Sequence, residues 1–188
     1  MILTGKELAL TEWLNWLISL LYKRGDPAEL DSWRPVVLLH TVYKVLTAIL
    51  TEQLAIIAEK YGLLSSSQEG FQLHRNCTRQ LQSLLWGIEK SRREGTKLYT
   101  VFVNFENTFN SPDHGAIWAW LKLMNVPDID LLQELYEGSF FQVDSDFGRT
   151  ARVFLMWGLK QGDCLSPLLF DLIFDVLLRA MAERNDRV

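Results

Sequence analysis

The stretch Gly158-Leu-Lys-Gln-Gly-Asp-Cys-Leu-Ser-Pro-Leu-Leu-Phe170 leads from a glycine-containing turn into a strongly apolar segment. Its Ser166-Pro167 pair predicts a helix start, because serine caps free backbone N–H groups and proline fits the first helical position. We expect this helix to run to about Glu183. Only Asp171 and Asp175 interrupt its first apolar turns, so most of its sides should be covered by protein.

The rest of the chain mixes predicted strands and helices. Strands are predicted from apolar and β-branched runs at residues 14–21, 98–103, 139–145 and 150–156, the last two forming a pair. Helices are predicted at residues 41–60, 77–93, 114–124 and 128–138. The second helix should bury Leu81, Leu84, Leu85 and Ile88. Residues 27–35 contain two prolines and predict a loop. Strands and helices do not alternate regularly, which favours the α+β class over a doubly wound parallel sheet.

Composition limits what the chain can be. Its 188 residues include 19 basic and 23 acidic side chains, giving a net charge of −4, and 48% of the residues are hydrophobic. These values are typical of one folded domain. A freestanding nucleic-acid-binding protein usually has a strong excess of Lys and Arg. Any such role must therefore rest on a local patch or on a basic partner.

Cysteine usage and the N-terminal residues bear on location. Cys77 and Cys164 are far apart and form neither a disulfide framework nor a metal cluster, which favours an intracellular, reducing compartment. Residues 8–22 are apolar but contain Glu12 and Asn15, and the unbroken apolar part is too short to span a bilayer. We expect neither a membrane span nor a signal peptide.

Four blocks of sequence support a functional interpretation. They are Leu21–Asp26 with Trp33–Leu39, Gln68–Phe71 with Arg75, Val101–Asn110, and Gly158–Phe170. In this order they closely resemble the reverse transcriptases of LINE-type (non-LTR) retrotransposons, from about residue 13 to residue 182. The last block is the most specific, and its residues that match the family pattern are Gly158, Gln161, Gly162, Ser166, Pro167, Leu169 and Phe170.

The resemblance implies an architecture and a site. It implies an incomplete right-handed polymerase, with fingers over residues 1–95, a partial palm over residues 96–188 and no thumb, in one continuous folded unit. Nucleotide addition in this family is a phosphoryl transfer assisted by two Mg²⁺ ions that carboxylates hold. The residues implied to lie along nucleotide or template are Arg34, Arg75, Phe109, Gln161 and Gly162.

Two departures from the family pattern affect this site. Asn104 stands where the family has its first metal-binding aspartate, and Asn110 stands where it has a supporting aspartate. An amide oxygen carries no charge to hold Mg²⁺ against water. The later Asp-Asp pair of the family does not follow the last block before Val188. We therefore predict no intact catalytic residue, no bound Mg²⁺ and no polymerase activity from this chain alone.

Other assignments of individual residues stay open. Glu106, Asp113 or Asp163 could replace a lost carboxylate, although each has a simpler role, as a solvent-facing residue, a helix cap and a turn residue respectively. Arg34 could pair with a nearby carboxylate to fix its loop, in place of binding phosphate.

The function that these observations favour is that of a retroelement-derived structural or accessory subunit in a larger complex, with other protein subunits covering the helix at residues 168–182. One alternative is a catalytically silent RNA-binding module. Another is a polymerase fragment completed by another chain that supplies the Asp-Asp pair. A decaying gene copy with no selected role is a further alternative.

Overall fold

A computed structural model describes residues 13, 15–72, 74–145 and 148–185. The sheet strands are β1 (Asn15–Tyr22), β2 (Trp33–Leu38), β3 (Phe140–Ser145), β4 (Gly148–Arg149) and β5 (Val153–Phe154). The helices are α1 (Thr41–Lys60), α2 (Cys77–Glu94), α3 (His114–Leu123), α4 (Ile129–Glu134) and α5 (Leu165–Asn185), with a 3-10 turn at Leu30–Ser32. This mixture of helices with a mixed sheet agrees with the predicted α+β class.

The sheet has the order β2-β1-β3-β4, and β5 pairs with β3. Strands β1 and β2 are antiparallel, whereas β1 and β3 are parallel. The expected strand at residues 14–21 is β1, although residue 14 lies outside the described residues. The expected loop over 27–35 is wrong at its end, because β2 begins at Trp33 and contains Pro35. Proline has no N–H to donate to a neighbouring strand. It is tolerated in β2 because β2 is an edge strand, and one side of an edge strand has no neighbouring strand to bond to.

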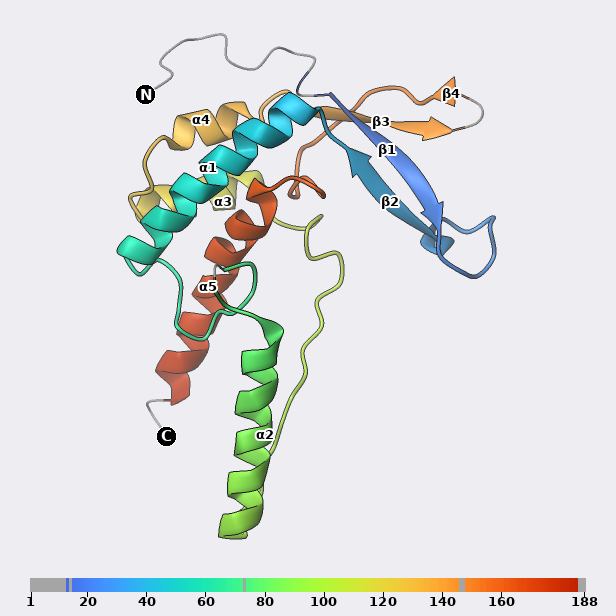
Figure 1. Cartoon of the computed structure of the whole chain (residues 1–188). Helices are drawn as coiled ribbons and strands as arrows, with labels where there is room; N and C mark the ends of the chain where they lie inside the picture. The colour runs from blue at the N-terminus through green and yellow to red at the C-terminus, as the bar shows by residue number, and fades with distance from the viewer. Residues whose placement is uncertain (1–12, 14, 73, 146–147, 186–188) are drawn as a thin grey trace.

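The core lies between α1, α3, α4 and the first half of α5, beside the sheet (Figure 1). Its fully buried residues include Tyr43, Ile117, Leu121, Leu135, Leu165, Leu169 and Leu172. The expected terminal helix is therefore covered over its first turns by its own chain. Helix α5 begins at Leu165, so Ser166 is not its cap but lies in its first turn, where Ser166 Oγ is 3.1 Å from the Tyr136 hydroxyl.

Helix α2 extends away from the other helices, and the following segment runs back beside it (Figure 1). Its bounds agree with the prediction to within one residue. Asn76 caps its N-terminus by accepting a hydrogen bond from the Arg79 amide, and Gly95 ends it in a left-handed conformation. The predicted buried face is wrong, because none of the residues of α2 is buried and Leu81 and Leu85 are more than half exposed.

The strand predicted at residues 98–103 is also absent. This segment has no regular secondary structure, and the side chains of Val101 and Phe102 are 82% and 83% exposed. A run of good strand formers becomes a strand only when a second backbone supplies hydrogen bonds. Among the described residues, no backbone group from Lys97 to Asn104 bonds to another backbone group.

The remaining elements are shorter than expected. Helix α4 ends at Glu134 instead of residue 138, and β5 is limited to Val153–Phe154, while residues 146–147 between the paired strands lie outside the described residues. Of the described helices, α1 alone is long and apolar enough to cross a membrane, a test that core helices of soluble proteins also pass. The absence of a membrane span stays a prediction.

Candidate functional site

The turn at Gly158–Asp163 packs against the end of the Val101–Asn110 block. The Leu159 amide donates to the Phe109 carbonyl at 2.6 Å, and the Gly158 amide donates to the Pro112 carbonyl at 2.7 Å. Gly158 has a φ of +81°, a conformation that favours glycine. These bonds bring Phe109 and Asn110 next to the turn that contains Gln161 and Gly162, so four of the residues that the sequence singled out lie on two adjoining segments.

A cavity of about 340 Å³ lies between this turn and the sheet. The sheet lines it with apolar side chains, among them Trp16, Ile18 and Phe141. At the turn, the amides of Asn110 and Gln161 border it, and Gln161 Nε2 donates to Asn110 Oδ1 at 3.2 Å. Such a cavity suits an apolar or aromatic group with one polar edge. Neither bordering amide has a charge to offer a phosphate or a metal ion.

Lys160 is the residue of the turn that sequence reasoning missed. Its side chain is completely buried, and Nζ donates hydrogen bonds to the Tyr43 hydroxyl at 2.8 Å and to the Leu135 carbonyl. Nζ also lies 4.4 Å from the centre of the Tyr43 ring and 4.9 Å from the centres of the Trp16 and Tyr136 rings. Three aromatic faces attract a cation strongly when water is excluded. This one ammonium group thus joins the turn to β1, α1 and the end of α4.

Asp163 ends the turn, as expected, with its amide donating to the Lys160 carbonyl at 3.2 Å, and its side chain is buried in the same region. Neither of its carboxylate oxygens has a well-formed hydrogen bond to a described residue. Burial raises the pKa of Asp163, while the Thr47 hydroxyl and the Lys160 ammonium act in the opposite direction. Burial also lowers the pKa of Lys160, and the negative charge of Asp163 opposes that shift. The two groups reduce each other's cost of burial without forming a direct ion pair.

Residues 22–188, which include this turn, match the family described as reverse transcriptase (RNA-dependent DNA polymerase). The chain belongs to the reverse transcriptase family. It is similar to the RNA-directed DNA polymerase from mobile element jockey of Drosophila funebris, with 26% identity over 161 residues, which is 83% of this chain and 17% of that protein.

Two further relatives also come from retrotransposons. The Pol polyprotein of the type-1 retrotransposable element R2 of Popillia japonica is 27% identical over 89% of this chain and 24% of its own length. The probable RNA-directed DNA polymerase from transposon X-element of Drosophila melanogaster is 26% identical over 85% of this chain and 18% of its own length. This reverse transcriptase domain is therefore distantly related to those of non-LTR retrotransposons. It spans about a quarter or less of the curated relatives that it matches.

The reverse transcriptase family implies Mg²⁺, and the candidate donors that the structure describes do not fit that ion. Asn104 is exposed and uncharged, and Asn110 accepts a hydrogen bond from Gln161. Glu106 is exposed, as expected, and Asp113 caps α3 by accepting from the Ala116 amide at 2.8 Å, also as expected. Within the described ranges, no group of three or more His, Cys, Asp and Glu side chains is arranged to hold a metal ion.

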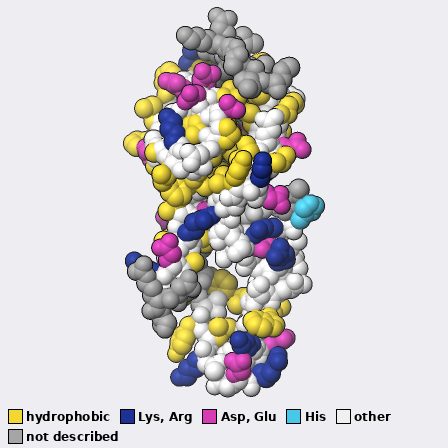
Figure 2. Space-filling model, turned by 90° about the vertical axis from the view of Figure 1, so that its left-hand side faces the viewer, with side chains coloured by type: hydrophobic (Ala, Val, Ile, Leu, Met, Phe, Trp, Pro, Cys, Tyr) yellow, Lys and Arg dark blue, Asp and Glu magenta, His cyan; other side chains and the backbone are white. Residues whose placement is uncertain are grey.

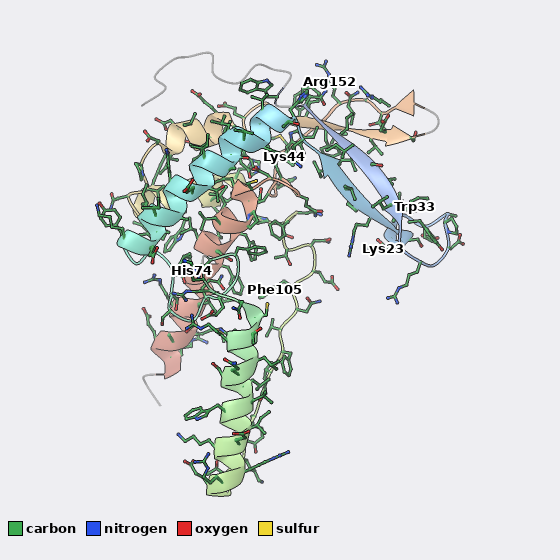
Figure 3. The ribbon with its side chains drawn as sticks, in the orientation of Figure 1. Lys23, Trp33, Lys44, His74, Phe105 and Arg152 are labelled. Atoms are coloured by element: carbon green, nitrogen blue, oxygen red, sulfur yellow. The ribbon has the colours of Figure 1, made fainter. Side chains whose placement is uncertain are left out.

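The two arginines of the predicted site lie apart from the turn. Arg75 donates to the carbonyls of Ser66 and Gln68 at 3.0 and 2.7 Å. Its guanidinium is therefore already used in holding its own loop together. Arg34 is exposed and forms no ion pair with any carboxylate in the described part of the chain, so the alternative of a loop-fixing pair is not observed. Its neighbour Trp33 lies with Lys23 at the end of the β1–β2 pair remote from the helices (Figure 3).

Phe109 takes part in a row of aromatic rings along α5. Its ring centre lies 5.4 Å from that of Phe170 and 6.5 Å from that of Phe71. The row continues from Phe170 to Phe174 at 5.6 Å and from Phe174 to Phe105, labelled in Figure 3, at 5.4 Å. Edge-to-face and stacked ring pairs of this kind hold the Asn104–Asn110 segment against α5.

Two buried aspartates of α5 fix the Gln68–Phe71 block. Asp175 accepts from the Ser65 amide at 2.6 Å and from Arg179, and Asp171 accepts from Gln68 Nε2 at 2.9 Å. The other oxygen of Asp171 has no hydrogen-bond partner among the described residues. Burial, followed by the negative charge of Asp175, raises the pKa of Asp171 to about 7. The interruptions of the apolar helix thus face inward and hold a loop.

Replacing Asp171 with Asn is expected to stabilise the fold at alkaline pH. The folded pKa of about 7 exceeds the ordinary value of 3.8, so the folded state binds the proton more tightly and stability falls as pH rises between these values. Asparagine does not ionise, so the variant does not lose stability in this pH range. Its side-chain oxygen can still accept the hydrogen bond from Gln68 Nε2. We expect a gain of about 1–3 kcal/mol in the free energy of unfolding at pH 8.

Urea unfolding of both proteins at pH 8 and pH 5 measures this effect, and the gain should shrink at the lower pH. The matched control is Asp144→Asn, because Asp144 is exposed and, among the described residues, forms its one ion pair with Arg149 at the surface. A pH-independent effect of Asp171→Asn, or an equal effect of the control, would contradict the prediction.

Proposed function

We propose that this chain is a reverse transcriptase-type domain that does not add nucleotides and that serves as a structural or accessory subunit in a larger protein assembly. The observation that carries the proposal is the neutral residue Asn104, where the family pattern places a metal-binding aspartate. Proteins usually hold Mg²⁺ through one or two carboxylates, whose negative charge offsets the cost of replacing part of its hydration shell. An amide at this position supplies the oxygen without the charge.

The neighbouring carboxylates offer no substitute for that charge. Asp163 is buried beside Lys160, whose positive charge would repel a metal ion. Asp113 is used as a helix cap, and Glu106 lies two residues after Asn104 on an exposed turn, outside any group of three or more potential metal ligands among the described residues. These placements support the loss of two-metal chemistry from the described residues.

Exposed apolar surface supports the packing role. The segment between α2 and α3 exposes Leu98, Tyr99, Val101, Phe102, Val103 and Phe105, and the second half of α5 exposes Val176, Leu177 and Met181. Covering apolar surface contributes about 25 cal/mol per Å². Apolar areas of this extent typically mark a protein–protein contact. We infer that further protein covers this segment and the exposed side chains in the second half of α5.

A polymerase fragment completed by another chain is the second candidate. It is favoured by the match of the Gly158–Phe170 block to the family pattern. In that case the partner would supply the missing carboxylates, and the Gln161 turn would keep its place beside the template.

Primer extension on an RNA template, with the chain in its native assembly and with Mg²⁺ or Mn²⁺, separates these candidates. We expect no extension above a control without protein. Asn104→Asp is compared with Asn107→Asp, which adds the same charge three residues away in the same exposed segment. Extension by the wild-type assembly, lost in Gln161→Ala, would contradict the proposal. Extension gained only by Asn104→Asp would show that the remaining metal ligands come from a partner.

The packing role is tested separately by the size of the native particle. We expect the chain of 21.8 kDa to sediment from native extracts in a larger complex. Charged substitutions at Val101 and Phe102 should release it, whereas Val153→Lys, at another exposed apolar side chain, should not. Sedimentation of the wild type as a free monomer would contradict the packing role while leaving the extension result intact.

A further inference from the structure

One face of α2 combines basic residues with an exposed tryptophan. Arg79, Trp86, Lys90 and Arg93 follow one another at spacings of seven, four and three residues. These spacings place all four side chains on the same side of a helix. We call them the α2 stripe. The opposite side of the helix carries Leu84 and Ile88, which are partly buried, so the stripe points away from the adjoining segment.

The stripe is exposed and largely free of internal partners. The Trp86 side chain is 62% exposed, and Lys90 Nζ lies 5.3 Å above its ring. Among the described residues, neither Lys90 nor Arg93 forms an ion pair or a side-chain hydrogen bond with the rest of the protein. Arg79, at the base of the helix, lies 3.5 Å from Glu69. Figure 2 shows several basic side chains at the lower end of the molecule, where α2 ends, with acidic side chains beside them.

The net charge of α2 and the residues just after it is opposite in sign to that of the whole chain. Residues 77–97 include five basic side chains and two acidic ones, Glu89 and Glu94, for a net charge of +3, while the whole chain has −4. A helix end favours basic residues through its dipole, which accounts for cations in the last turn. It does not account for a large aromatic ring exposed to water two turns earlier.

We propose that the α2 stripe binds single-stranded nucleic acid. Trp86 stacks on an unpaired base, and Lys90 and Arg93 contact the phosphates next to it. Aromatic rings flanked by cations suit single strands, because every base has a face to stack and every nucleotide a phosphate. The seven residue steps from Trp86 to Arg93 rise about 10 Å along the helix, the length of about three stacked nucleotides. A duplex would leave the Trp86 ring without a base face.

This contact lies apart from the Gln161 turn. Arg75 and Gln161 are bonded to their own chain, so the stripe is a surface where cations are available for phosphate. The inference does not rest on the proposed loss of nucleotide addition. Failure of the stripe to bind nucleic acid would leave the primer-extension result unchanged, and the converse also holds.

Fluorescence anisotropy with a labelled 15-nucleotide poly(U) RNA tests the proposal on the full chain. We expect Lys90→Glu with Arg93→Glu to weaken binding at least about 10-fold at 100 mM salt and to reduce the slope of log K against log salt by about 1.4, because two phosphate contacts are lost. Trp86→Ala should weaken binding about 5- to 100-fold through lost stacking while leaving the slope unchanged.

The end of α1 supplies matched controls. Lys60 Nζ lies 5.2 Å above the ring of Tyr61, which is 65% exposed, so this pair reproduces the cation and the ring without the stripe. Lys60→Glu and Tyr61→Ala should bind the RNA as the wild type does. All variants change exposed side chains, and thermal unfolding should confirm that they fold. The proposal fails if the wild type does not bind the RNA, if stripe and control variants behave alike, or if a duplex of equal length binds as tightly.

Discussion

Lys160→Met is expected to lower the free energy of unfolding by about 3–5 kcal/mol, the cost of removing one member of a pair of opposite buried charges, here Lys160 and Asp163, which interact without direct contact. Methionine has nearly the same length and fills the same space, so the loss comes from polar interactions. The hydroxyl of Tyr43 and the carbonyl of Leu135 lose their donor, and the carboxylate of Asp163 loses the buried cation that lies near it. Urea unfolding near pH 7 measures the change.

Two further variants show whether the loss comes from the charge pair. Lys122→Met changes an exposed lysine of α3 and should alter stability by less than about 0.5 kcal/mol. Adding Asp163→Asn to Lys160→Met removes the uncompensated carboxylate and should restore part of the stability. Equal effects at positions 160 and 122, or no recovery in the double variant, would show that Lys160 is not held by these contacts.

Gly158→Ala is expected to destabilise the protein by about 2–4 kcal/mol, through a strained backbone and an overpacked contact. A Cβ at this position would lie 2.9 Å from the Asn110 Cα and 3.0 Å from the Asn110 carbonyl atoms. Those are backbone atoms, which cannot rotate away. The substitution should therefore push the turn off the Asn110 segment and open the bond between Leu159 and Phe109.

Gly62→Ala is the matched control, because Gly62 has a φ of +60° but no described atom lies within 4 Å of the position that an alanine methyl group would take. It should cost only about 1 kcal/mol, from the left-handed backbone alone. Urea unfolding of the two variants gives the difference, which is the cost of crowding at Gly158. If both variants lose the same free energy of unfolding, then crowding against Asn110 is not the reason that position 158 requires glycine.

The helices could be predicted well because their signals are local. Helix α1 has the predicted bounds, and α2 has recognisable residues at both ends, with Asn76 as its cap and Gly95 as its stop. The strands depended on distant partners. Strand β2 was missed because Pro35 argues against a strand unless the strand is known to lie at an edge. Residues 98–103 were assigned as a strand because composition cannot report whether a second backbone is present.

The candidate site was predictable only in part, for the same reason. The contact of Asn110 with Gln161 joins two blocks that the sequence had already singled out. The environment of Lys160 was missed, because Trp16, Tyr43 and Tyr136 are far from it in sequence and a lysine is ordinarily solvated. The high aromatic content was the one available signal of such an environment, but it could not indicate which residues would surround Lys160. Asp171 and Asp175 appeared as interruptions of an apolar helix, and their loop contacts required the fold.

The uncharged stretch Leu98–Phe105 also bears on solubility. Consecutive residues of mostly high strand propensity, with no charge and no proline among them, are the kind of sequence from which cross-β aggregates start. Lys97 and Glu106 stand at its two ends, and charges so placed act as gatekeepers that slow the stacking of identical segments. The concentration at which this protein stays dispersed therefore depends on whether that stretch is shielded, and on these two charges when it is not.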